Sequence, residues 1–421
     1  MTRRRHARGF TLVELLVSLT AGLLVALAVV ALSKDSTQTF YEEQRAASAE
    51  MSLRLAVDRL RQDVQRASFM ASGNVLADTF VPLVASDVNK IPAGGAPAGL
   101  QNLAGIRLDW KGSAALTPQS SSNGNGFQPD AIFLTGNFTS ADEYPVQNVT
   151  AGTGCGGQAF NISIVSASWY RVLTSPNPLA TLQQMFTPVT SPAGLKFMAR
   201  VADDLGRFQY VVICGVGMNG AQPYVEVDSS TPVPLAQYGF VDGRLTINPV
   251  QTVRWEILPL PAATYPQYAP LDPGTGAPPK YNLVREWVDS TGAVVGVPEL
   301  IAEYAVDLKF AFTADVGTYT GVVPAPSLIA YDFDAAQNQA LAPLTISATT
   351  QSQRIRKVRI RVSTRSPMGD RGGPITAPDG YPMRYCTLAG GCTTSADSRD
   401  FARMRTITTE VALPNQARLF F

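Results

Sequence analysis

The chain has almost no histidine. His6 is the only one among 421 residues, and it stands in a short basic segment, residues 1–9, that the pattern described below predicts to be cleaved off. A chain without histidine cannot run a Ser–His–Asp or Cys–His mechanism, and it cannot build a zinc site with a histidine ligand. This absence excludes the commonest hydrolase chemistries, although carboxylate-only and metal-assisted chemistry stay open. We expect no enzyme activity, no cofactor and no metal.

Cysteine is also scarce. The chain has four cysteines, and no two of them have the short spacing, such as CxxC, that zinc sites use. Cys386 and Cys392 enclose five residues and are expected to form a disulfide, in which case Cys155 and Cys214 would form the other. Four cysteines allow three pairings, and the sequence does not choose among them.

Charged residues are also few. They make up 16 % of the chain, below the ~25 % of average globular proteins.

A long apolar run begins near the N-terminus and holds a single charge. Arg3, Arg4, Arg5 and Arg8 precede Gly9, and the only charge in the run from Phe10 to Leu32 is Glu14. A secretory signal places its cleavage site after the apolar segment. Here the candidate site, between Gly9 and Phe10, precedes that segment, so cleavage would leave the apolar helix on the mature chain. Removing four arginines takes the formal net charge from +1 to −3.

The apolar run is long enough to cross a membrane. Residues 10–33 would span about 36 Å as a helix at ~1.5 Å per residue, against a hydrocarbon core of ~30 Å. The arginines before the run keep that end in the cytoplasm by the positive-inside rule. A carboxylate near the start of such a helix costs ~2.5–3.5 kcal/mol on insertion scales, which makes Glu14 a functional candidate. The alternative is a plain single-pass anchor in which Glu14 reaches the interface.

The order Gly9, Phe10 and Glu14, with the glutamate fifth after the cleavage site, resembles the type IV prepilin pattern. The resemblance implies cleavage after Gly9 by a prepilin peptidase and methylation of the new N-terminus at Phe10. It also implies that Glu14 pairs with a free N-terminal amine, its own or a neighbour's, when subunits enter a fibre.

Helical periodicity continues beyond the apolar run, through residues 34–70. Small and apolar residues recur at three- and four-residue steps and predict an amphipathic helix that packs on a globular domain; they are Ala46, Ala49, Leu53, Val57, Leu60, Val64 and Ala67. We expect the helix to run to about Ser68 and to stop at Gly73–Asn74. The alternative is a separate coiled-coil stalk, although three heptads are short for one.

Residues 71–421 are expected to form a β-rich globular head with loop insertions. Short apolar or alternating runs bounded by turn residues predict strands at Ala104–Trp110, Ala131–Leu134, Ala159–Val165, Trp169–Leu173, Phe208–Cys214, Val253–Leu258, Tyr281–Val288, Ala305–Phe312, Ile355–Ser363 and Thr406–Leu413. Asp289–Gly292 predicts a turn. The predicted fold class is α+β and type IV pilin-like: a long N-terminal α-helix, with its first half transmembrane, packed on a large antiparallel β-rich C-terminal domain.

The C-terminal third resembles PilW-type minor pilins, and shares much of the pattern with the J-type minor pseudopilins of type II secretion. The segments that carry this resemblance are Tyr281–Trp287, Pro298–Phe310, Val358–Ser366 and Thr406–Asn415. It implies a minor pilin in a priming or tip complex that initiates a type IV pilus, the fibre of twitching motility and adhesion. Its partners would be other minor pilins, the major pilin and prepilin peptidase. The chain would first span the inner membrane with its head in the periplasm, and then join the fibre at the cell surface.

Two alternatives stay open. One is a J-type pseudopilin, to which the same physical arguments apply, and the other is a membrane-anchored adhesin or binding protein.

A basic face is predicted on the strand at residues 355–363 and the residues just after it. Lys357, Arg359, Arg361 and Arg365 alternate with apolar residues and would share one face. We favour a solvated or intersubunit face. The more specific interpretation is that this face binds an anionic partner, such as nucleic acid, lipid headgroups or an acidic neighbouring pilin.

Overall fold

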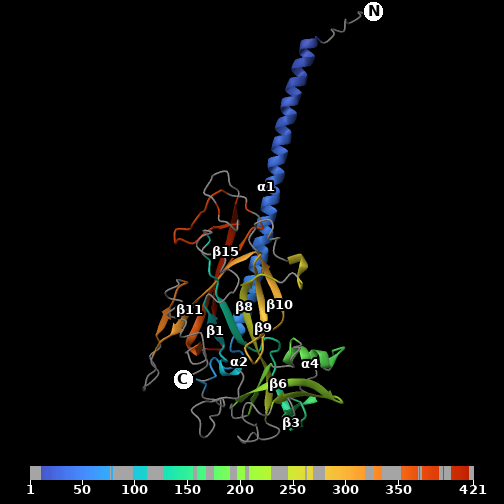
Figure 1. Ribbon diagram of the computed structural model, residues 1–421, viewed down its shortest axis with the longest axis vertical. Coiled ribbons are helices and arrows are strands. Elements are labelled where there is room, and N and C mark those ends of the chain that lie inside the picture. Colours follow the sequence, from blue (N-terminus) through green and yellow to red (C-terminus); the bar gives the residue numbers. More distant parts are fainter. Residues whose placement is uncertain are drawn as a thin grey trace, which may run out of the picture. The chain divides into compact units, whose positions relative to one another are not determined.

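A computed structural model of the chain describes residues 11–75, 77–78, 98–110, 125, 127–154, 159–166, 175–189, 197–203, 208–228, 245–260, 263–268, 280–317, 327–333, 352–367, 369, 372–387, 392 and 400–416. The chain divides into two compact units, residues 1–51 and residues 52–421. The N-terminal helix α1 (Leu12–Arg66) contributes to both units, and Figure 1 shows the chain with several of its helices and strands labelled.

The first unit consists of the apolar part of α1. The helix has 55 residues without a break, which corresponds to about 82 Å at ~1.5 Å per residue. Leu12–Tyr41 is long and apolar enough to cross a membrane, and the large apolar side chains from Leu12 to Leu32 are all more than half exposed. The predicted apolar helix is confirmed, and its length matches the thickness of a bilayer.

The helix ends close to the predicted residue, but not at the predicted stop signal. It ends at Arg66, two residues before the expected end at about Ser68, and the predicted stop at Gly73–Asn74 is wrong. Ser68 and Met70 take left-handed backbone conformations, with φ of 61° and 54°, which end the helical path. The Ser68 N–H donates to the carbonyl of Thr135 (2.8 Å), so the chain leaves the helix by bonding to a strand.

Ten strands form the first sheet of the second unit. They are β1 (Ile106–Asp109), β2 (Ala131–Gly136), β3 (Tyr144–Gly152), β4 (Ala159–Ile164), β5 (Met198–Ala202), β6 (Phe208–Asn219), β7 (Gln222–Asp228), β8 (Thr246–Leu258), β9 (Asn282–Val288) and β10 (Val294–Glu303). All of their pairings are antiparallel. The predicted turn at Asp289–Gly292 is confirmed as the hairpin between β9 and β10, where Gly292 N–H donates to the Asp289 carbonyl (3.0 Å).

Strand β8 divides this sheet into two parts. Its first half pairs with β3 on one edge and with β5 on the other, so that β8, β3, β4, β7, β6 and β5 close a ring. Inside lies an apolar cluster that includes Ile162, Phe197 and Val225. The short helix α4 (Pro178–Phe186), capped by the side chain of Asn177, adds Leu182 and Phe186 to this cluster. The second half of β8 pairs with β2 and β9.

The second sheet has five antiparallel strands in the order β12-β11-β13-β15-β14. Their bounds are β11 (Ala305–Asp315), β12 (Leu328–Ala330), β13 (Ile355–Arg365), β14 (Arg384–Cys386) and β15 (Phe401–Ala412). Tyr304 alone connects β10 of the first sheet to β11 of the second, in a left-handed conformation with φ of 54°. One residue therefore makes the corner between the sheets. The short elements α2 (Ala98–Gln101), η4 (Pro266–Tyr268) and η6 (Ser352–Arg354) lie in connections.

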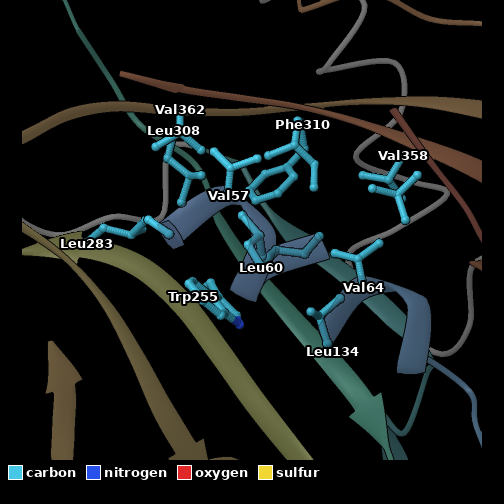
Figure 2. Packing of buried hydrophobic residues seen from close by; sticks show 14 of the residues in the cluster. Val57, Leu60, Val64, Leu134, Trp255, Leu283, Leu308, Phe310, Val358 and Val362 are labelled. Atoms are coloured by element: carbon cyan, nitrogen blue, oxygen red, sulfur yellow. The ribbon is translucent and has the colours of Figure 1, made fainter. Parts of the chain in front are cut away.

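The last turns of α1 lie between the two sheets. Figure 2 shows Val57, Leu60 and Val64 of the helix with Leu308, Phe310, Val358 and Val362 on one side and Leu134, Trp255 and Leu283 on the other. Leu53, Leu60 and Val64 are fully buried there. The predicted apolar stripe is thus confirmed from Leu53 to Ala67, and the fold class is the predicted one: a long N-terminal helix followed by a large antiparallel β-rich domain.

Candidate assembly site

Glu14 closes the first turn of α1 through a capping box. The backbone N–H and the hydroxyl of Thr11 each donate to Glu14 Oε2 at 3.0 Å, and the Glu14 N–H faces Thr11 Oγ1 at 3.3 Å. A Thr-x-x-Glu pair of this kind satisfies donors that the start of a helix leaves unpaired. The carboxylate is therefore directed back along the chain, toward the residue just after Phe10.

This geometry bears on the predicted role of Glu14. The predicted cleavage site, Gly9 and Phe10, lies outside the described residues. The structure brings the Glu14 carboxylate to the backbone nitrogen of Thr11, one residue from the nitrogen that cleavage after Gly9 would free. A carboxylate in this position can accept from an amine as it accepts from an amide, and with greater strength because both groups are charged.

The second half of α1 is attached to the first sheet by a buried ion pair. Asp63, which is 3 % exposed, accepts at Oδ2 from Arg285 Nε (2.7 Å) and from Trp255 Nε1 (3.0 Å). The Arg285 guanidinium also lies 4.2 Å from the ring centroid of Trp287 and 3.4 Å from Glu299 Oε2. The helix is therefore held in one register on β8 and β9, because only Asp63 meets both donors.

Sequence reasoning missed this attachment. In the sequence, Asp63 is one of many charged residues between Lys34 and Arg66, and Arg285 is one of two charged residues in the predicted strand Tyr281–Val288. A signal existed: Asp63 follows Leu60 by three residues, so it lies on the edge of the buried stripe. A charge at that position needs a partner inside the protein.

The cysteine predictions are resolved in part. Cys386 and Cys392 form the predicted disulfide, with a Cα–Cα distance of 5.7 Å. Cys214 is also disulfide-bonded, whereas Cys155 lies outside the described residues. The disulfide of Cys386 closes a small loop just after β14, at the edge of the five-stranded sheet.

The basic residues of β13 do not form one open face. Three of them have an acidic neighbour: Lys357 Nζ lies 2.8 Å from Glu410 Oε1, Arg359 Nη1 lies 3.2 Å from Asp332 Oδ1, and Arg361 Nε lies 3.1 Å from Asp307 Oδ2. Arg365 is 4 % exposed, and its Nη1 donates to the carbonyls of Ser366 and Pro367 at 3.0 Å each. These partners weaken the attraction of the strand for an anion.

A buried carboxyl group lies on the first sheet. Glu256 of β8 is 3 % exposed, and Arg254 Nη2 lies 2.9 Å from its Oε2. Burial, followed by a hydrogen bond to the carboxyl of Glu286, raises the pKa of Glu256 to about 8, although Arg254 acts in the opposite direction. A carboxyl that holds its proton near neutral pH makes the stability of this sheet depend on pH.

Comparison with known proteins finds a sequence motif in the first residues of the chain. Residues 4–31 match the family model of the prokaryotic N-terminal methylation motif. No curated protein and no solved structure matches the chain. The chain thus carries a type IV prepilin-like methylation motif, which supports a type IV pilin-like or pseudopilin-like protein that is processed by prepilin peptidase. A helix apolar enough to cross a membrane directly follows the start of this motif, as membrane anchoring of such a protein requires.

Proposed function

We propose that the chain is a minor pilin of a type IV pilus, which takes part in the complex of minor pilins that initiates fibre assembly. The observation that carries the proposal is the combination of the methylation motif with an apolar helix whose first turn is closed by Glu14. The match covers the part of the chain that the prepilin peptidase would recognise and cleave. The PilW-like segments of the C-terminal third support the choice of a minor pilin.

Assembly in this proposal is a membrane reaction between helices. The apolar side chains of α1 from Leu12 to Leu32 have no partner among the described residues of the chain. In the membrane they contact lipid, and in a fibre they would contact the equivalent helices of other pilins. Transfer of Glu14 to that apolar environment is costly unless a positive charge compensates it, and the free amine at Phe10 of the same or a neighbouring subunit would supply that charge.

The β-rich head has a passive role in this step. The ion pair of Asp63 with Arg285 and the burial of Leu53, Leu60 and Val64 fix the second half of the helix in the second unit. A force on the helix is therefore transmitted to the head. No catalysis is part of the proposal.

Deletion of the gene in its host, followed by counting of surface fibres, tests this function. We expect a large loss of fibres, which the wild-type chain restores and Glu14→Ala does not. The same strains are assayed for secreted protein. A normal fibre count with a loss of secretion would replace the proposal with the J-type pseudopilin, and no change in either would favour the membrane-anchored binding protein.

A further inference from the structure

The outer face of the five-stranded sheet carries a cleft. Side chains alternate along a strand, so Leu308 and Phe310 of β11 point to α1, whereas Asp307 and Lys309 point to the opposite face. Segments before β2, after β12 and before β14 cross that face and border an open space of about 540 Å³. Pockets that hold small ligands have volumes of ~300–1,000 Å³.

A buried carboxylate forms the floor of the cleft. Asp307 is 1 % exposed, and its Oδ2 accepts from Arg361 Nε (3.1 Å) and from the Tyr381 hydroxyl (3.0 Å). Its other oxygen, Oδ1, has no donor in the described part of the chain. Buried polar atoms nearly always have a hydrogen-bond partner, and one without a partner calls for an explanation. Asp307 belongs to the lining of the cleft, and a hydroxyl donor is the kind of partner that its Oδ1 lacks.

Aromatic rings form the walls. The Arg361 guanidinium carbon lies 4.2 Å from the ring centroid of Tyr381 and 4.8 Å from that of Phe333. Phe127 meets Tyr381 edge to face, with centroids 5.9 Å apart. These contacts hold the rings in place, so a flat ligand would meet a prearranged surface.

The charges of the lining limit the ligand. Ion pairs hold most charges of the lining: Arg361 with Asp307, Lys309 with Asp130 (2.9 Å) and Asp332 with Arg359 (3.2 Å). An ionic ligand of either sign would have to compete with these pairs. A neutral ligand with many hydroxyls avoids this competition, because each hydroxyl can donate to a carboxylate and accept from an N–H.

We infer that this cleft binds an uncharged saccharide, whose apolar C–H face lies against the aromatic rings and whose hydroxyls bond to the Asp, Lys and Arg side chains. The site is on the face of the head opposite the helix, so it does not depend on the assembly role of α1. It gives the head a recognition function that the proposed assembly role does not require.

Saturation-transfer NMR on the full-length chain tests this site. The protein is held in micelles of a detergent without a sugar headgroup, and the probes are cellobiose, lactose, maltose and N,N′-diacetylchitobiose. We expect transfer to at least one disaccharide, and none to a heparin oligosaccharide. Phe333→Ala should weaken binding about tenfold, or ~1.4 kcal/mol, because it removes one aromatic wall of the cleft.

Matched controls separate the cleft from general damage. Phe160→Ala removes a partly buried ring of β4, and Asp142→Ala removes an exposed carboxylate before β3, both outside the cleft; neither should change binding. Asp379→Ala, at the exposed rim of the cleft, should weaken it. Three outcomes would overturn the inference: no transfer to any of the four disaccharides, equal binding by cleft and control variants that keep their circular dichroism, or preferential binding of the heparin oligosaccharide.

Discussion

Removal of the Asp63 carboxylate should strongly destabilise the head. In Asp63→Ala the buried guanidinium of Arg285 and the indole N–H of Trp255 both lose their acceptor. Breaking a buried ion pair by removing one partner costs ~3–5 kcal/mol, because the other charge stays buried. Arg285 keeps Glu299 at 3.4 Å, a partly exposed partner, so we expect a loss near the lower limit, about 3 kcal/mol.

Urea unfolding of the full-length chain in detergent micelles measures this loss. The chain has four tryptophans, and the fluorescence that they give together reports on unfolding. The free energy of unfolding comes from linear extrapolation to zero urea. Asp63→Asn, which keeps an oxygen for Trp255 but removes the charge, should lie between the wild type and Asp63→Ala.

Asp58→Ala is the matched control for this experiment. Asp58 lies on the same helix, but its side chain is 62 % exposed and its partner Arg61 is 3.6 Å away. Exposed pairs contribute ~0–1 kcal/mol, so this variant should unfold close to the wild type. Equal losses for Asp58→Ala and Asp63→Ala would refute the reasoning, since the Asp63 pair would then contribute no more than a surface pair.

Three further predictions follow from other contacts. Glu14→Gln keeps an oxygen for the Thr11 donors but loses the charge, so the helix should form while the amount of chain in sheared fibres drops sharply; Thr11→Ala keeps the charge, costs ~0.5–2 kcal/mol of helix stability, and should still enter fibres on immunoblots. Replacing both Cys386 and Cys392 by serine opens a loop with a sequence separation of six and should cost about 2 kcal/mol in urea unfolding. The loss should be smaller than that of the reduced wild type, because reduction also breaks the disulfide of Cys214, and no loss would contradict the prediction. The raised pKa of Glu256, about 8 against 4.5, means that the folded chain retains a proton that the unfolded chain releases, so stability should fall as the pH rises through this window. Glu256→Gln removes that dependence, so its stability relative to the wild type should increase as the pH rises toward 8 and above. An unchanged pH dependence of the urea midpoint would show that another group is responsible.

Local patterns predicted the elements that bury one face continuously. The apolar stripe from Leu53 to Val64 and the alternation of β13 follow directly from the periods of helix and strand. The strand predicted at Trp169–Leu173 lies outside the described residues. Strands with less apolar character were missed: β7 (Gln222–Asp228) contains a proline and two acidic residues, and β10 (Val294–Glu303) is largely exposed on both faces.

Long-range pairing could not be predicted. β8 contacts β2, β3, β5 and β9, and nothing in residues 246–258 alone determines that its two halves have different partners. The same holds for the candidate sites. Gly9, Phe10 and Glu14 stand at fixed spacing in one segment, so the sequence alone predicts them as a site, whereas Asp63 and Arg285 are far apart in sequence and meet only through the packing of α1 on β9.

Mass spectrometry of the N-terminal peptide, from protein recovered in sheared surface fibres, tests the central claim most directly. The account predicts a peptide that begins at Phe10 with a methylated amine, because cleavage after Gly9 and methylation are the steps that the matched motif specifies. A chain that still begins at Met1 and stays in the membrane fraction would contradict the pilin account and favour a membrane-anchored binding protein.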